Sequence, residues 1–479
     1  MNLKKIFSSS FLVPISCFLL IAITVLCSRQ QHTYQESNCF LVIYNHSKLP
    51  LLKLLFDPLR TDWQCYQARE LSYLVDALDA RFIYGCIKLK LAHFYSLSAI
   101  IFTLAGAAYI SSMLRKLYSD AAEYLYYLPP LLYTLVHLDS ISFFRSSKPA
   151  VAFGTTLIFF YFADLLKDPE KYSRIRSHWY AILTILLLPY FDRMGFFVTA
   201  VTAAGSITLM LAAATPQGER FQLGSKHLPA LRPMVITATL SALLSVIYNF
   251  HIAPRIINAL NGYYPSFEYQ RLPEGSFLNI KAGVLFLIEN TGHTFTALKL
   301  NPAAFAGIII VLLVTAIALN LHKCDHLPRY FLPIWLLSLG TMVFCAAIIT
   351  CRHPAMMKPD VIYGIYFLIF ETLFVNFITI LLFSTPGKTM LKKILVFLFA
   401  AGIAARIFMT ASPPDKDGHL AMHHATTPYT IEMLNHPEKR PDRPLPQSSA
   451  HLIKFVHNRP GVLPLELTNP RFRKQDIRK

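Results

Sequence analysis

Residues 57–82 read DPLRTDWQCYQARELSYLVDALDARF, the first long polar stretch of a chain that otherwise consists mostly of hydrophobic segments. Thr61 and Gln64 have the spacing of a capping box, which predicts that a helix begins at Thr61. This helix then carries an apolar stripe at helical spacing, formed by Leu71, Leu74, Val75 and Leu78. We therefore predict an amphipathic interfacial helix shortly after the first hydrophobic segment.

The composition places the chain among membrane proteins. Of its 479 residues, 54% are hydrophobic and 15% are charged, and the mean hydropathy is +0.43. Apolar runs of about 17–25 residues recur along the whole length, which is the length that crosses a bilayer as a helix. Strands of a membrane β-barrel would show alternation instead of continuous apolar runs. The sequence therefore predicts an all-α polytopic membrane protein.

The apolar runs predict about 11 transmembrane helices, at residues 11–27, 92–113, 121–137, 149–166, 178–191, 195–214, 234–252, 303–321, 330–350, 361–384 and 394–411. The prolines at 129–130 are expected to kink the third helix. The chain then divides into a signal-anchor span (1–27), a first loop (28–91), spans 2–7 (92–252), a second loop (253–301), spans 8–11 (302–411) and a Pro-rich tail (412–479).

The net charge of +18 reflects basic loops between these segments. Such loops set membrane topology and meet anionic lipid, so we expect no nucleic-acid partner. The loops after spans two, four, six, eight and ten are the basic ones, which predicts a cytoplasmic N-terminus and extracytoplasmic long loops. The C-terminal tail then falls outside as well. The short basic start suits a bacterial plasma membrane.

The acids of the first loop are the candidate catalytic residues: Asp57, Asp62 and Glu70. A carboxylate at the outer membrane surface can act as general base on a substrate hydroxyl, or bind a divalent metal such as Mg²⁺ or Mn²⁺ that bridges to phosphate. A structural alternative is equally open for each acid. Asp62 would then only complement the helix dipole, and Asp76, Asp79 and Arg81 would form a solvated face.

Basic residues on the same predicted side are candidate phosphate ligands. Arg352 and His353 follow the ninth span, and Arg69 lies in the first loop. The planar fork of arginine suits phosphate oxygens, although snorkelling to lipid head groups would explain a basic span end equally well. Asp192 and Arg193 end the fifth span on that side, where they would act in the site or anchor the interface.

Glu371 is the one acidic residue inside the predicted tenth span. A carboxylate within the bilayer is expensive and is by default a functional hypothesis. It would be the coupling residue of a transporter, or would only hydrogen-bond to a neighbouring helix.

The layout of these features resembles the GT-C superfamily of integral-membrane glycosyltransferases over most of the chain. The resemblance implies a polyprenyl-phosphate sugar donor, a catalytic acid at Asp57 or Asp62, and a phosphate contact at Arg352 with His353. The loop lacks an adjacent pair of acids, so the identity of the acid stays open. Two alternatives remain: an O-antigen polymerase or ligase that relies on the second loop and Arg352, and a transporter or flippase of lipid-linked sugars.

Overall fold

The computed structural model describes residues 9–27, 50–56, 69–89, 96–138, 147–262, 280–298, 301–328, 361–387 and 389–411, together with single positions at 41, 44, 45, 264, 330, 331, 335, 339, 340, 342, 343 and 346. All regular secondary structure within these residues is helical. The predicted fold class is confirmed to this extent.

Most helices in the described part of the chain have 17 residues or more, and the others have nine or fewer. The first half contains α2 (Ser9–Cys27), α4 (Leu51–Leu55), α5 (Glu70–Lys88), α6 (Leu97–Leu117), α7 (Leu128–Val136), α9 (Ser147–Lys167), α10 (Trp179–Leu187) and α11 (Arg193–Ala213). The second half contains α12 (Leu228–Ile247), α13 (Ala253–Asn261), α14 (Ile280–Thr296), α15 (Asn301–Lys323), α17 (Val361–Ser384) and α18 (Met390–Ala411). Every predicted span other than the ninth, at 330–350, overlaps one or more of these helices.

Five helical segments in the described part of the chain are long and apolar enough to cross a membrane, namely Leu97–Leu117, Ser147–Lys167, Arg193–Ala213, Ser225–Asn261 and Asn301–Lys323. The count of about 11 spans stays a prediction. Most of the predicted ninth span lies outside the described residues, although Trp335 is buried and stacks on Phe377 of α17 with ring centroids 3.5 Å apart.

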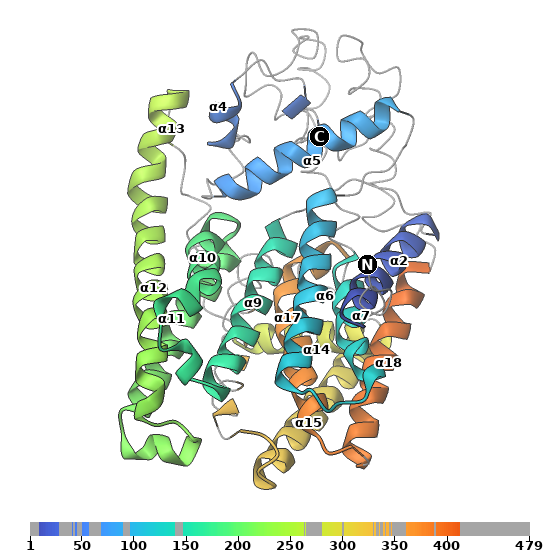
Figure 1. Ribbon diagram of the computed structural model, residues 1–479. Coiled ribbons are helices and arrows are strands. Elements are labelled where there is room, and N and C mark those ends of the chain that lie inside the picture. Colours follow the sequence, from blue (N-terminus) through green and yellow to red (C-terminus); the bar gives the residue numbers. More distant parts are fainter. Residues whose placement is uncertain are drawn as a thin grey trace, which may run out of the picture.

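The long helices form a bundle, and α5 lies across one end of it (Figure 1). Inside the bundle α9 packs against α6, α10 and α17, while α11 packs along α12. The prolines at 129–130 occupy the first turn of α7, where no backbone N–H is needed, so they start this helix and the predicted kink was wrong.

Two glycines allow α14 and α15 to form a tight hairpin. A Cβ atom at Gly292 would fall on the carbonyl oxygen of Ala303, and one at Gly307 would fall on that of Ile288. The two backbones therefore touch, as small residues permit between membrane helices. The region predicted as the second long loop thus holds two helices, α13 and α14.

The helix α5 differs from its prediction at its start and in its exposed face. It begins at Glu70, after a non-helical Arg69, so it does not start at Thr61, which lies outside the described residues. Asp79 is 3% exposed and Leu78 is 61% exposed. Both Asp76 and Asp79 therefore face the protein, and part of the apolar stripe faces outward. The prediction that these two acids form a solvated face was wrong.

Hydrogen bonds fix this orientation of α5. Asp79 Oδ1 accepts from the backbone N–H of Ser98 at 3.0 Å, and its Oδ2 accepts from the Ser96 and Ser98 hydroxyls at 2.5 Å each. The Ser96 hydroxyl in turn accepts from the N–H of Ala99 at 3.0 Å and caps α6. A single carboxylate therefore ties α5 to the first turn of the helix beneath it.

Candidate functional site

The best-formed polar cluster at the α5 end of the bundle centres on Asp192. This residue caps α11 by accepting the backbone N–H of Met194 at 3.0 Å. The turn before it is tight, because Gly195 leaves room for the carbonyl of Leu188, which a Cβ atom there would strike. The sequence Asp-Arg-Met-Gly therefore supplies both the cap and the small residue that place this carboxylate.

Two basic side chains from other elements meet the Asp192 carboxylate. Lys148, in the first turn of α9, donates from Nζ to Oδ1 at 2.7 Å, and both side chains are buried. Arg69, just before α5, places Nε 3.8 Å from Oδ2. Burial acts to raise the pKa of Asp192, but the charges of Lys148 and Arg69 outweigh it and hold the pKa below its usual range.

Glu70 lies beside this cluster among aromatic side chains. The Tyr248 hydroxyl is hydrogen-bonded to Glu70, and the rings of Tyr248 and Tyr190 meet edge to face with centroids 5.1 Å apart. Tyr248 opens the π-helical turn η7 (Tyr248–Ile252), and single π-helical turns within helices are frequent at functional sites.

An apolar cavity of about 380 Å³ lies between α9, α11 and α17. Met194 lines it and also donates its backbone N–H to Asp192, so the cavity approaches the charged cluster at the first turn of α11. Thr155 lines it on α9, about two turns below Lys148. The rest of the wall is mainly phenylalanine and aliphatic side chains, among them Phe159, Phe197, Phe331 and Phe370.

The structure brings together three of the predicted site residues, Arg69, Glu70 and Asp192. Arg193 follows as the first, half-buried residue of α11. Asp57, Asp62, Arg352 and His353 lie outside the described residues. In the described part of the chain, no group of three or more His, Cys, Asp or Glu side chains lies close enough to hold a metal ion.

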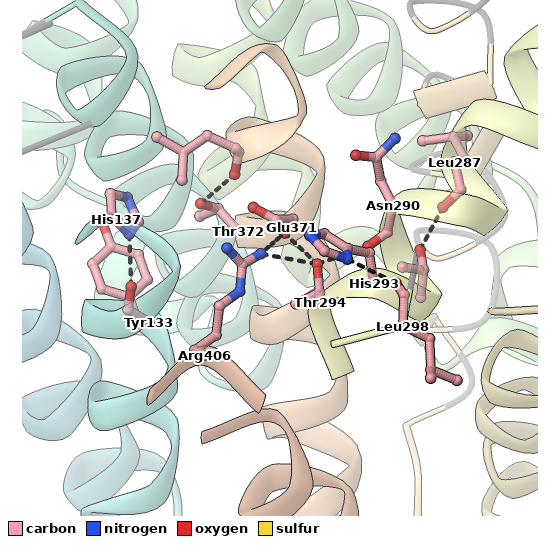
Figure 2. A network of polar contacts seen from close by, with 12 residues as sticks. Tyr133, His137, Leu287, Asn290, His293, Thr294, Leu298, Glu371, Thr372 and Arg406 are labelled. Carbon is pink, nitrogen blue, oxygen red and sulfur yellow. Dashed lines mark hydrogen bonds and ion pairs between the residues drawn. The ribbon is translucent and has the colours of Figure 1, made fainter. Parts of the chain in front are cut away.

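Glu371 lies away from this cluster, inside the bundle. It pairs with Arg406 of α18, and the hydroxyl of Thr294 on α14 hydrogen-bonds to the same carboxylate oxygen (Figure 2). Arg406 Nη2 also donates to the Thr294 hydroxyl at 3.0 Å. Figure 2 shows His137 on the far side of Arg406, with Nδ1 2.7 Å from the carbonyl oxygen of Tyr133.

Sequence reasoning missed Lys148, Tyr190, Tyr248 and Arg406. Lys148 reads as an ordinary basic span end, and both tyrosines read as interfacial aromatics. Arg406, however, lies inside an apolar run and carried the same signal as Glu371, a charge within a span. Comparisons with protein-family models, with curated proteins and with solved structures found no match for this chain.

Proposed function

We propose that this protein is a membrane glycosyltransferase that moves a sugar from a polyprenyl-phosphate donor to an extracytoplasmic acceptor of the bacterial cell envelope. The observation that carries the proposal is the meeting of Arg69, Glu70 and Asp192 at one end of the bundle, next to an apolar cavity. A donor of this class has a long apolar chain, an anionic phosphate and a sugar. The apolar cavity suits the chain, the basic side chains suit the phosphate, and Glu70 suits the reaction at the sugar.

The basic side chains would hold the donor phosphate. Arg69 and Lys148 place two positive charges at the Asp192 carboxylate, and cationic side chains of this kind attract a phosphate group. Asp192 Oδ2 lies 3.8 Å from Nε of Arg69, so this ion pair keeps the guanidinium at the cluster. The exposed fraction of the Arg69 side chain is 19%, against 3% for Lys148. Arg69 is therefore the better placed to meet phosphate oxygens, which it can bind with two parallel N–H groups.

Glu70 is the described carboxylate best suited to act as general base, with Asp57 and Asp62 as the other acids of the loop. The acceptor hydroxyl oxygen would form a bond to the anomeric carbon of the sugar while its proton passes to Glu70. The bond between that carbon and the phosphate oxygen breaks, and polyprenyl phosphate leaves with the electron pair. The hydrogen bond from Tyr248 would orient Glu70 for this transfer. No step of this scheme requires a metal ion.

The apolar cavity would receive the part of the polyprenyl chain next to the phosphate. Its wall reaches Met194, directly beneath the charged cluster. Burying an isoprenoid chain there would supply binding energy remote from the reacting bond, which can be used to position the sugar.

The test is release of lipid phosphate from radiolabelled undecaprenyl-phosphate sugars by the purified protein in nanodiscs. Glu70→Gln should lower the release rate at least about a hundredfold, as expected for loss of a general base. Glu123→Gln is the matched control, because Glu123 is an exposed acid at the end of α6 remote from α5. Equal release by the Glu70→Gln variant and the parent would reject Glu70 as the base and return the role to Asp57 or Asp62.

One observation favours the alternative of a transporter of lipid-linked sugars. Glu371 and Arg406 form a buried ion pair that joins α17 and α18 within the bundle, and ionisable groups at such depth often serve transport. Substrate flux across proteoliposomes that is lost in Glu371→Gln would support this function. The polymerase or ligase alternative relies on Arg352 and His353 and predicts that release is lost in Arg352→Gln but kept in variants of the first loop such as Glu70→Gln.

A further inference from the structure

At the end of the bundle remote from α5, two lysines share one buried carboxylate oxygen. Lys116, in the last turn of α6, and Lys171, in the 3₁₀ turn η2 (Glu170–Tyr172), both donate to Asp164 Oδ2, Lys171 at 2.9 Å. The Tyr172 hydroxyl donates to the same atom. The lysine side chains are each 41% exposed, whereas Asp164 is 5% exposed. One carboxylate therefore balances only one of two adjacent ammonium groups.

A buried hydrogen-bond network holds this pair of lysines in place. His178 Nε2 lies 2.7 Å from the carbonyl oxygen of Tyr172, to which it donates, and His178 Nδ1 then accepts from the Tyr161 hydroxyl. The rings of Tyr161 and Tyr172 meet edge to face, 5.2 Å apart. This packing fixes the turn that carries Lys171 onto α9. The two ammonium groups are thus kept close together before any ligand arrives.

Apolar and aromatic side chains are exposed next to the lysines. Ile175, in the next 3₁₀ turn, is 67% exposed, and Trp179, at the first position of α10, is 66% exposed. Tryptophan with one face on a helix and one outward is typical of the lipid head-group region. The Trp179 ring rests edge to face on Tyr180, 5.9 Å away. The surface therefore combines a positive charge with an apolar anchor.

The depth of this surface matches a bilayer boundary. Ser98, the residue that meets α5, and Lys116 lie 18 positions apart on α6. At 1.5 Å per residue this is about 27 Å, close to the thickness of about 30 Å of the hydrocarbon core. Asp164 and Lys171 lie at the end of the neighbouring candidate span, Ser147–Lys167. The lysines are therefore at head-group level when the spans cross the membrane.

We propose that Lys116, Lys171 and Trp179 form a binding site for an anionic phospholipid of the inner leaflet. The lipid phosphate would lie against the two ammonium groups, and an acyl chain would pass along Ile175 and Trp179. The surplus charge next to Asp164 selects an anionic head group over a zwitterionic one. This site is independent of the proposed transferase centre at the α5 end.

The experiment uses Trp179 as the reporter in the full-length protein. A variant with Trp63→Phe and Trp335→Phe retains Trp179 as its only tryptophan. It is placed in nanodiscs containing increasing fractions of dibrominated phosphatidylglycerol or dibrominated phosphatidylcholine. We expect half-maximal quenching at a roughly fivefold lower mole fraction for phosphatidylglycerol, the ratio given by one net lysine charge at a membrane surface. Equal quenching by the two lipids would overturn the proposal.

Two further variants attribute the selectivity to the site. The first is a triple variant with Lys116→Gln, Lys171→Gln and Asp164→Asn. It removes the charges without leaving a buried carboxylate unpaired, and it should abolish the preference for phosphatidylglycerol. Lys226→Gln with Lys323→Gln is the control. It removes two exposed lysines, one in the 3₁₀ turn before α12 and one at the end of α15, and Figure 1 shows both of these helix ends at the end of the bundle opposite α5. A preference that survives in the first variant, or disappears equally in the control, would show that general surface charge attracts the lipid and would overturn the site.

Discussion

Asp192 is the residue on which the α5 end of the bundle depends. Its carboxylate caps α11 and receives Lys148 from α9 and Arg69 from the segment before α5. Three elements distant in sequence therefore meet at one buried group. Breaking such a pair leaves a charge buried without its partner, which is costly in a region of low dielectric constant.

Asp192→Asn is expected to lower the free energy of unfolding by about 3–5 kcal/mol, because it strands the buried ammonium group of Lys148 while the amide can still cap α11. Lys148→Met combined with Asp192→Asn should recover much of this loss, since no buried ammonium remains at that position. Thermal unfolding in nanodiscs measures both. A double variant that is no more stable than Asp192→Asn would show that the ion pair is not the cause.

The pH dependence of this pair follows from the lowered pKa of Asp192. A carboxyl whose pKa is lower in the folded state stabilises the protein above its unfolded pKa, and this contribution disappears as the pH falls towards the folded value. The difference in melting temperature between the parent and Asp192→Asn should thus stay constant from about pH 8 to about pH 5 and shrink only below about pH 4. A difference that already shrinks near neutral pH would contradict the lowered pKa.

Part of this site could be predicted from the sequence. The positive-inside rule placed Arg69, Glu70 and Asp192 on one side of the membrane, and that assignment sufficed to group them. It could not identify Lys148 as the partner of Asp192, because a lysine at a span end is the ordinary case. It also could not find Tyr248, because nothing in the sequence YNFHI marks the π-helical turn that presents this tyrosine.

The helix α5 carries the site because its orientation is fixed by polar contacts. Asp79 binds the capped start of α6, which sets the rotation of α5 about its axis. Glu70, at the start of α5, is thereby held near Tyr190 and Tyr248. The apolar stripe of an amphipathic helix is usually assigned to the core, yet Leu78 and Phe82 face outward here. That inversion could not be predicted from periodicity, which gives a stripe but not the side it faces.

The close approach of α14 and α15 can be tested by adding a methyl group at their contact. Gly307→Ala should lower the free energy of unfolding by about 1–3 kcal/mol, because the added Cβ atom forces the two backbones apart. Gly85→Ala is the matched control, since a Cβ atom at this position of α5 meets nothing within 4 Å. The control should be neutral or slightly stabilising. Equal effects of the two substitutions in thermal unfolding would contradict the close approach of these helices.

The whole molecule has two polar ends separated by the length of its long helices. Continuous apolar runs made the positions of most helices predictable, because a helix satisfies all of its backbone groups within one segment. Where runs are short or interrupted, prediction failed. The segment before α14 contains polar residues and reads as a loop, yet α14 itself packs closely along α15. The close approach of the two backbones at Gly292 and Gly307 accounts for that packing.

Orientation across the membrane is testable through cysteines placed at the two ends. In a background with the eight native cysteines replaced by serine, Leu78→Cys on α5 should react with an impermeant thiol reagent added outside intact cells. Lys226→Cys, in the 3₁₀ turn before α12 at the opposite end, should react only after the membrane is opened. Leu78 and Lys226 are both exposed in the structure. The reverse pattern would contradict the orientation predicted from the basic loops.

Steady-state kinetics can separate donor binding from chemistry at the α5 end. Steady-state release of lipid phosphate from an undecaprenyl-phosphate sugar is measured in nanodiscs for the parent, Arg69→Gln and Glu70→Gln. Arg69→Gln is expected mainly to raise KM, because it weakens binding of the phosphate. Glu70→Gln is expected mainly to lower kcat, because it removes the base. Unchanged kinetic constants in both folded variants would show that this cluster does not form the active site.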